Sequence, residues 1–389
     1  MAPGPIAGAE NVVLEGCAAL THEGHDLVLL VMSEQRCPEH GERFLEEARM
    51  RGIAARDIRV RGRIDVRALR DLRRSIDRAA PEVVHVHGYK ALVYTFLACP
   101  NRFPLVVTHH GETGHDRAAR LYEGLARRLY RRVSRVFAVS ERTADALADA
   151  GVPRSKLRTV PNPIALPSEE VPGLTDPDDL RLLFVGRLSE EKGLDVLLQA
   201  LAAPGIAEGL VLDVAGDGPC RASWTQLAKS LGLDERVRWL GMRRDVPELL
   251  GRSSILVLPS RREGLPLAVL EATSRGVPAL ASRVGGIPEA VWEGENAILL
   301  EPGHVDAWIS QLLRLPDRIG TLREGARRRA HEVVERHAPA TWAARTTACY
   351  EELSAVPLEA SRTGAIEPPT RSNSTRTERD LFQKGAGRR

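Results

Sequence analysis

PSRREGLPLAVLE, residues 259–271, joins an apolar run of strand length to a helical pattern. The run before it, ILVL at residues 255–258, predicts a buried strand, and Pro266 predicts the first turn of a helix. Glu263 then lies on a loop at the carboxyl end of the strand, and Glu271 follows within the helix. Loops at this edge line the crevice in which open α/β sheets bind ligands. Taken alone, such a pair is more often a surface-loop glutamate and a helix-face glutamate.

Short apolar runs alternate with amphipathic helical patterns on both sides of this stretch. In the first half we predict strands at residues 26–32, near 58, and at 82–86, 105–108 and 135–139, with helices at 10–21, 43–50, 65–79 and 117–132. In the second half we predict strands at residues 182–185, 211–215, 237–240, 255–258, 278–281 and 297–300. Such regular interleaving is typical of doubly wound parallel sheets, so the predicted fold class is α/β with two Rossmann-like sheets.

Changes in composition divide the chain. Residues 161–179 are rich in proline and acidic residues, which predicts a linker between an N-terminal domain at 1–160 and a C-terminal domain at 180–335. A last helix at 336–356 is expected to cross back to the N-terminal domain. Residues 357–389 carry almost no apolar side chains, which indicates a disordered tail.

The N-terminal domain lacks its expected opening strand. Only seven residues precede Gly8, too few for a strand and its turn. Either the domain lacks this strand or the natural start lies upstream of Met1. We expect an upstream start.

Composition excludes several classes of protein. The 389 residues are 43% hydrophobic and 28% charged, which is typical of a soluble globular chain of two domains. A net charge of +3 gives no reason to expect a nucleic-acid partner. No apolar run approaches the roughly 20 residues of a membrane span, and the start MAPGPIAGAE lacks the features of a signal peptide. Five scattered cysteines without metal-ligand spacing indicate reduced thiols in a cytoplasm.

A basic turn follows the strand predicted at residues 182–185. Residues 186–193 read GRLSEEKG and place Arg187 and Lys192 at the mouth of a helix. Arginine binds phosphate oxygens bidentately, lysine supplies a point charge, and the helix N-terminus adds unpaired amides. The turn therefore predicts a clamp for an anion, although an exposed basic turn is the alternative.

Further turns after predicted strands carry weaker signals. His109 and His110 end the sequence VVTHH, and histidine is the side chain most easily tuned near neutral pH. Each histidine alone is as consistent with a structural role as with a functional one. GDGP at residues 216–219 and the glycine pair at 285–286, which precedes a helix predicted at 287–293, tolerate a phosphate but are also explained as tight turns.

Together these motifs resemble glycosyltransferase family 4. The resemblance rests on their order and spacing: GAE (8–10), VVHVHG (83–88), VVTHHG (106–111), AVSE (138–141), VPNP (160–163), FVGRLSEEKG (184–193), GDGP (216–219) and EGLPLAVLEA (263–272). It runs from Gly8 to about residue 350. The family implies retaining enzymes of the GT-B fold, in which two Rossmann-like domains face each other across a cleft and use a nucleotide sugar.

The resemblance also implies roles for individual residues. Arg187 and Lys192 would hold the donor diphosphate and neutralise the charge that develops on it as the glycosidic bond breaks. Glu271 would accept hydrogen bonds from the ribose hydroxyls. Glu263 would contact the transferred sugar, and His110 would lie near the same sugar from the other domain.

Backbone groups complete the implied donor site. The amides of Gly264 and Leu265 would approach the phosphates. Gly8 would approach the diphosphate from the N-terminal domain, although Ala7 replaces the first glycine of the family's pair. Because two cations already stand at the diphosphate and no Asp-x-Asp ends a strand, neither a metal nor another cofactor is expected.

The implied activity is transfer of a sugar from a UDP- or GDP-sugar to a saccharide or lipid-linked acceptor in bacterial cell-surface polysaccharide or glycolipid biosynthesis. Only Glu263 is a credible carboxylate near the sugar, so we expect a same-face substitution rather than the paired carboxylates of a retaining glycosidase. A non-catalytic nucleotide-sugar-binding protein and a GT-B sugar-nucleotide epimerase are the alternatives. Loops near Met242 and at residues 88–90 are expected to choose the donor and acceptor, whose identities the sequence leaves open.

Residues 117–135 form the most basic segment, RAARLYEGLARRLYRRVSR, with seven arginines and one glutamate. Leucine or valine recurs every four residues, which predicts a basic amphipathic helix. Such a helix can lie on an anionic membrane, here the inner face of the plasma membrane, and would suit a lipid-linked acceptor. A leucine stripe facing the core beneath a solvated arginine face is the alternative.

Overall fold

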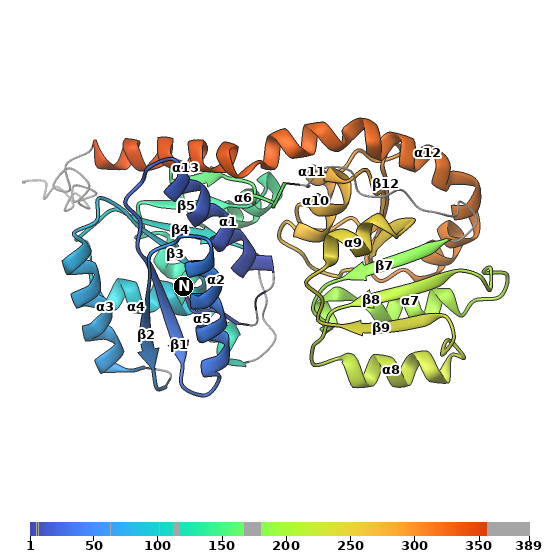
Figure 1. Cartoon of the computed structure of the whole chain (residues 1–389), viewed down its shortest axis with the longest axis horizontal. Helices are drawn as coiled ribbons and strands as arrows, with labels where there is room; N and C mark the ends of the chain where they lie inside the picture. The colour runs from blue at the N-terminus through green and yellow to red at the C-terminus, as the bar shows by residue number, and fades with distance from the viewer. Residues whose placement is uncertain are drawn as a thin grey trace, which may run out of the picture. The chain divides into compact units, whose positions relative to one another are not determined.

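The computed structural model describes residues 1–4, 6, 8–62, 64–100, 102–111, 117–166 and 180–355, and of residues 117–123 it describes the backbone alone. Most of the predicted linker, at 167–179, and the predicted tail at 357–389 lie outside these residues. The described part forms two α/β halves followed by two helices (Figure 1).

The first half contains six parallel strands. Its elements are α1 (Gly8–His22), β1 (Leu29–Glu34), α2 (Pro38–Met50), β2 (Ala55–Val60), α3 (Val66–Ala79), β3 (Val84–His87), α4 (Tyr89–Ala98), β4 (Leu105–His109), α5 (Arg117–Tyr130), β5 (Arg135–Ala138), α6 (Glu141–Asp149), a 3-10 turn (Arg154–Lys156) and β6 (Leu157–Thr159). The sequence analysis missed α4, because this helix is apolar on nearly every side and shows no amphipathic period.

The strands of this half form two separate sheets. β1 pairs with β2, and β3, β4, β5 and β6 pair in that order, all in parallel. The backbone of Met1 bonds to β1 as a parallel neighbour would. The Met1 amine donates to the Leu30 carbonyl oxygen at 2.8 Å, and the Met1 carbonyl oxygen accepts from the Met32 amide at 2.7 Å. Met1 therefore lies beside β1, as a neighbouring strand would.

The second half forms one six-stranded parallel sheet. Its elements are β7 (Arg181–Val185), a 3-10 turn (Glu190–Lys192), α7 (Leu194–Leu201), β8 (Val211–Ala215), α8 (Arg221–Ser230), β9 (Val237–Gly241), α9 (Val246–Gly251), β10 (Ile255–Leu258), α10 (Leu267–Ser274), β11 (Ala279–Ser282), α11 (Ile287–Ala290) and β12 (Ala297–Leu300). The strand order is β12-β11-β10-β7-β8-β9. Counted from β7, this is the order 3-2-1-4-5-6 of dinucleotide-binding domains, and it reverses between β7 and β10.

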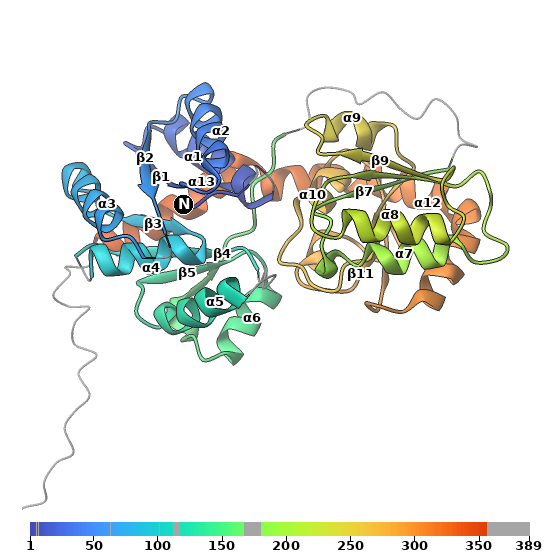
Figure 2. The ribbon, with the colours of Figure 1, turned by 90° about the horizontal axis from the view of Figure 1, so that it is seen from below.

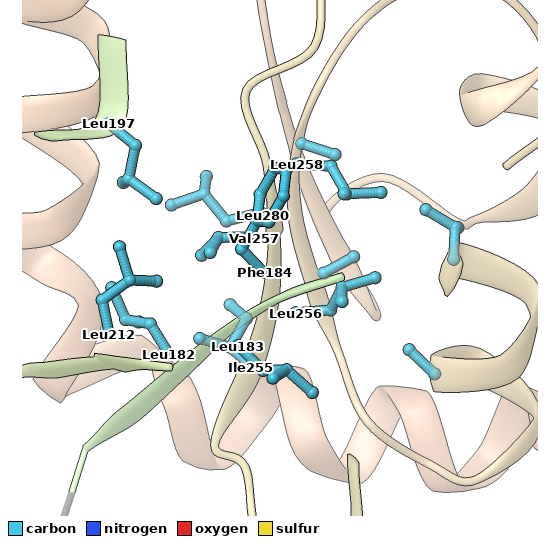
Figure 3. Close-up of a cluster of buried hydrophobic side chains, with 14 of the residues drawn as sticks. Leu182, Leu183, Phe184, Leu197, Leu212, Ile255, Leu256, Val257, Leu258 and Leu280 are labelled. Atoms are coloured by element: carbon cyan, nitrogen blue, oxygen red, sulfur yellow. The ribbon is translucent and has the colours of Figure 1, made fainter. Parts of the chain in front are cut away.

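Apolar strands hold the second half together. Every residue of β10 is at most 1% exposed, and Leu182, Leu183 and Phe184 of β7 are completely buried. Figure 3 shows these side chains gathered with those of neighbouring strands and of α7. Helices cover both faces of the sheet (Figure 2). The buried strands are continuous apolar runs for that reason, and the sequence analysis placed them within a residue or two.

The last two helices return the chain to the first half. α12 (Val305–His337) ends at Ala338, and α13 (Pro339–Ser354) follows. α13 packs against α1, where the Trp342 ring fills the space beside Gly16 so closely that a Cβ there would lie 2.7 Å from it. Figure 1 shows α13 among the elements of the first half.

Several helix boundaries differ from the predictions, among them the start of the helix predicted at 43–50, which begins at Pro38. The helix predicted at 287–293 ends at Ala290, because the backbone becomes extended at Val291. The Arg-rich helix ends at Tyr130 rather than at residue 132. Pro266 precedes α10 as its cap, with an extended backbone, instead of lying in its first turn.

Candidate active site

The turns after β7 and β10 meet at the point where the strand order reverses. Lys192 comes from the turn after β7 and Glu263 from the loop after β10. The Lys192 ammonium donates to both carboxylate oxygens of Glu263, at 2.7 and 2.8 Å. Since ligands of open α/β sheets bind at this switch point, the two predicted site residues lie where the fold favours a ligand.

Glu263 is held from two sides in a nearly dry environment. Its side chain is 6% exposed, and that of Lys192 is 20% exposed. Ser260, which is completely buried, donates its hydroxyl proton to the Glu263 carboxylate at 2.7 Å. A carboxylate so buried needs such partners, because desolvation without them is costly. The sequence analysis missed Ser260, although its position three residues before Glu263 in a loop was visible.

The turn carrying Lys192 packs closely against the loop carrying Glu263, through backbone and side-chain contacts. Gly193 has a φ of +61°, and a Cβ there would lie 2.2 Å from the carbonyl oxygen of Pro259. The Arg261 guanidinium binds Asp195 of α7 through two hydrogen bonds, at 2.8 and 2.6 Å. These contacts hold the lysine and the glutamate at a fixed separation.

The two other predicted donor-site side chains come from the same two segments, the turn after β7 and the helix after the Glu263 loop. Arg187 follows β7 and is exposed, and its guanidinium makes no hydrogen bond or ion pair with any residue that the structure describes. Glu271 lies in α10, and burial raises the pKa of its carboxyl, an effect that nearby Arg275 opposes. The arrangement offers one unpaired cation and one desolvated carboxylate to a ligand.

His110 meets the Glu263 loop from the first half. A Cβ on Gly264 would lie 2.3 Å from the carbonyl oxygen of His110, so only glycine allows the two backbones to approach this closely. The imidazole Nε2 of His110 lies 3.1 Å from Nδ1 of His87, and burial lowers the pKa of His110 to about 4. Nδ1 of His110 is shielded from solvent and has no hydrogen-bond partner among the described residues.

His109 has a different role. Its Nδ1 lies 3.1 Å from the hydroxyl of Tyr130, its side chain is 6% exposed, and burial lowers its pKa to about 4. The ring is a satisfied core residue on the opposite side of β4 from Thr108, whose hydroxyl contacts His85. The structure therefore makes His109 a core residue, in keeping with the family resemblance, which gave a role to His110 alone.

Backbone positions complete the predicted set. Leu265 is 6% exposed, and its carbonyl oxygen accepts a hydrogen bond from the Asn162 side chain at 3.0 Å. Gly8 is the first residue of α1, where helix amides have no partner within the helix. Its preceding residue, Ala7, lies outside the described residues.

Two further links between the halves were missed. The Glu289 carboxylate of α11 accepts the backbone amides of Glu141 and Arg142 at 2.8 and 2.9 Å, and so caps α6. The backbone carbonyl oxygen of Asn162 accepts a hydrogen bond from Nδ1 of His337 at 2.8 Å. Glu141 and Asn162 lie in the motifs AVSE and VPNP that the sequence analysis quoted. The sequence does not show which distant residues they contact.

Within the described residues, one group of side chains could hold a metal ion. Cys37, Glu39 and His40 have ligand atoms within 4.8 Å of one another at the start of α2. Partial exposure and a helix start explain this group without a metal. No helix of the described part is both long enough and apolar enough to cross a bilayer.

Comparison with known families identifies the chain. A family model described as "Glycosyltransferase Family 4" matches residues 6–166, and one described as "Glycosyl transferases group 1" matches residues 179–317. The chain belongs to glycosyltransferase family 4. The family predicted from the ordered motifs is thus confirmed.

Curated relatives of this glycosyltransferase match it over part of their length. A stretch of 134 residues is 34% identical to N-acetyl-alpha-D-glucosaminyl L-malate synthase from Bacillus anthracis, covering 34% of this chain and 35% of the relative. A stretch of 169 residues is 34% identical to D-inositol 3-phosphate glycosyltransferase from Saccharomonospora viridis, covering 39% of each. The matches thus span about a third to two fifths of these relatives.

Solved structures confirm the GT-B fold. The glycosyltransferase superposes on Anabaena HepE in complex with UDP-glucose with a TM-score of 0.77 and 20% identity, over 91% of this chain and 98% of the other. It superposes on sucrose-phosphate synthase from Thermosynechococcus elongatus with a TM-score of 0.73 and 18% identity, over 90% and 95% of the two chains. At these identities the likeness concerns the fold alone.

Proposed function

We propose that this family 4 glycosyltransferase transfers a sugar, with retention, from a UDP- or GDP-sugar to a saccharide or lipid-linked acceptor in cell-surface polysaccharide or glycolipid biosynthesis. The observation that carries the proposal is the ion pair of Lys192 and Glu263 at the switch point, with Arg187 exposed in the same turn as Lys192. A nucleotide-sugar diphosphate carries the charge that Arg187 and Lys192 complement. UDP is the favoured nucleotide, since HepE was solved with UDP-glucose.

The proposed chemistry uses one face of the sugar. The bond between the anomeric carbon and the diphosphate oxygen breaks, the acceptor oxygen bonds to the same face of that carbon, and the leaving phosphate takes the acceptor proton. Arg187 and Lys192 stabilise the charge on the leaving diphosphate. Glu263 contacts the sugar and His110 lies on its other side. A trapped covalent adduct between Glu263 and the sugar would contradict this mechanism.

The ion pair between Lys192 and Glu263 gives the donor a defined entry step. In the proposal, the diphosphate takes over the ammonium of Lys192, and Glu263 turns its released oxygen toward a sugar hydroxyl while keeping Ser260 as a partner. Glu271 accepts the ribose hydroxyls as a carboxylate. The amides of Gly264 and Leu265 and the start of α1 at Gly8 face the phosphates.

A small polar acceptor is a second candidate. The names of the two curated relatives include inositol 3-phosphate and L-malate, which are a polyol phosphate and a hydroxy acid. Acceptor assays therefore include polyol phosphates and hydroxy acids beside saccharides and lipid-linked sugars. Lys90, whose ammonium binds Glu34 at 2.8 Å after β3, lies in the segment expected to choose among them.

The proposal needs no metal and no other cofactor. Arg187 and Lys192 neutralise the diphosphate charge that a divalent ion neutralises in metal-dependent enzymes. Transfer at full rate in the presence of EDTA is the expected result. Loss of activity with EDTA, restored by a divalent metal, would contradict this part of the proposal.

Association with the inner face of the plasma membrane is proposed through α5. Arg127, Arg128, Arg131 and Arg132 are exposed at its carboxyl end, whereas Leu129 and Val133 are buried in the core. The membrane contact is therefore electrostatic.

Changing the four arginines to serine should abolish flotation with anionic liposomes. The matched control changes four exposed arginines of α3, at positions 67, 70, 73 and 74, and should float like wild type; equal flotation of all three proteins would end the idea.

The deciding experiment is a screen of UDP- and GDP-sugars for donor hydrolysis and transfer, with wild type and Glu263→Gln. We expect one nucleotide sugar to be hydrolysed by wild type, and Glu263→Gln to bind it but react about 100-fold more slowly or worse. Binding without any turnover by wild type would favour a non-catalytic nucleotide-sugar-binding protein. If no nucleotide sugar is bound or hydrolysed, the enzyme proposal fails.

A further inference from the structure

His110 is held in place by a second histidine. His87 is the last residue of β3, His110 follows β4, and the two strands pair in parallel. Nδ1 of His87 lies 3.1 Å from Nε2 of His110, and the rings stack with centroids 5.3 Å apart. We propose that His87 is a positioning residue that fixes both the orientation and the ring tautomer of His110, and so presents Nδ1 of His110 to a hydroxyl of the transferred sugar. This inference rests on the proposed function.

The shared proton couples the two rings. Burial lowers the pKa of His110 to about 4 and that of His87 well below its ordinary value, so both rings are neutral near pH 7. A neutral imidazole carries one N–H and one bare nitrogen. If Nδ1 of His87 donates, Nε2 of His110 is bare and the proton of His110 is on Nδ1. If Nε2 of His110 donates instead, its Nδ1 is bare. The tautomer of His110 therefore follows that of His87.

The free nitrogen of His110 indicates what it binds. Nδ1 is buried and has no partner among the described residues, and a buried polar atom without a hydrogen-bond partner destabilises the site until a ligand supplies one. It belongs to a residue whose backbone touches Gly264, next to Glu263. A sugar hydroxyl both donates and accepts, so it satisfies this nitrogen in either tautomer.

The support of His87 continues into the core. Its ring lies 4.4 Å, centroid to centroid, from that of His85. His85 is bonded on both sides, to the hydroxyl of Tyr350 on α13 at 2.5 Å and to that of Thr108 at 2.7 Å. A line of buried rings thus joins the last helix to His110, which gives His87 little freedom to move.

The test compares variants that keep or remove the polar atom of His87. His87→Asn places an amide atom where Nδ1 stands, and His87→Leu removes it. We expect His87→Leu to lower kcat for donor hydrolysis about 10- to 100-fold with little change in KM, because misplacement of a group at the reacting centre acts on the chemical step. His87→Asn should recover most of the loss. Tyr130→Phe, which removes the partner of the equally buried His109, should stay near wild type.

A double variant and a spectrum separate positioning from packing. His110→Ala sets the floor, and His87→Leu combined with it should cost nothing more, because both act through the same ring. Additive losses, or a His87→Asn variant no better than His87→Leu, would overturn the inference. The imidazole ¹⁵N shifts of His110 should report one neutral tautomer in wild type and in Tyr130→Phe, and a mixture in His87→Leu; unchanged shifts would also overturn it. This readout needs no turnover, so it stands even if the proposed activity fails.

Discussion

The pair formed by Lys192 and Glu263 is the residue-scale feature on which the proposed site depends. Lys192→Met should lower the free energy of unfolding by about 1–3 kcal/mol, because it leaves a buried carboxylate with Ser260 as its remaining partner. Adding Glu263→Gln should restore part of this stability, because the uncompensated charge is removed. Urea unfolding of wild type, both single variants and the double variant measures the coupling. Additive effects would show that the pair does not stabilise the fold.

Gly193 is a second residue at which geometry leaves one choice. Gly193→Ala combines a left-handed backbone with a Cβ 2.2 Å from the Pro259 carbonyl, so it should lose more than about 2 kcal/mol and should weaken donor binding by displacing Lys192. Gly232 has a similar φ of +71° and open space around it. Gly232→Ala should therefore lose only about 1 kcal/mol and bind donor normally. Unfolding midpoints and donor titrations compare the two; equal effects would contradict the close approach.

At the scale of elements, Asn162 joins the segment after β6 to the loop before α10. Its side chain is 5% exposed and donates to the Leu265 carbonyl oxygen. Asn162→Ala should cost about 1–2 kcal/mol of stability and also raise the KM for donor, since Leu265 is predicted to face the phosphates. Asn296→Ala removes another buried asparagine, one that bonds the Trp292 amide instead. Asn296→Ala should lower the stability without changing the KM for donor. If both variants raise this KM equally, the proposed placement of Leu265 at the phosphates is contradicted.

At the scale of the whole molecule, buried histidines make stability depend on acid. Burial lowers the pKa of His109, His110 and His337 to about 4 and that of His85 to about 3, against about 6.5 in the unfolded chain. The unfolded state then binds more protons below pH 6.5, so the stability is complete above that pH and is lost as pH falls toward 4. Glu271, whose pKa is raised, opposes this as a single group. The urea midpoint should fall between pH 7.5 and 5; a constant midpoint would contradict the expectation.

Most of the second half could be predicted from the sequence, because its strands are buried on both faces and appear as apolar runs. β10 was predicted with its observed bounds, and β8 and β12 likewise. α4 was missed because it is apolar on nearly every side, even where Leu97 is exposed. Periodicity reports one polar face, so elements without such a face are hidden from it.

The candidate site was predicted residue by residue, but its contacts were not. Arg187, Lys192 and Glu263 follow strands, and strand ends could be located. The bond between Lys192 and Glu263 joins residues 71 apart, and that between Asn162 and Leu265 joins residues 103 apart. His87 and Glu289 were passed over because each acts through a partner far along the chain, 23 and 148 residues away, whereas Ser260 was passed over although Glu263 is three residues away.

The sequence by itself determined the family, the two α/β halves and the rim on which the candidate residues stand, because burial and turn chemistry are local properties of the chain. The family resemblance singled out His110, but only the tertiary structure showed that its neighbour His109 is a core residue and paired His110 with His87. The physical reason is that strand order and register decide which rings face each other, and these depend on contacts between residues that the sequence does not bring together.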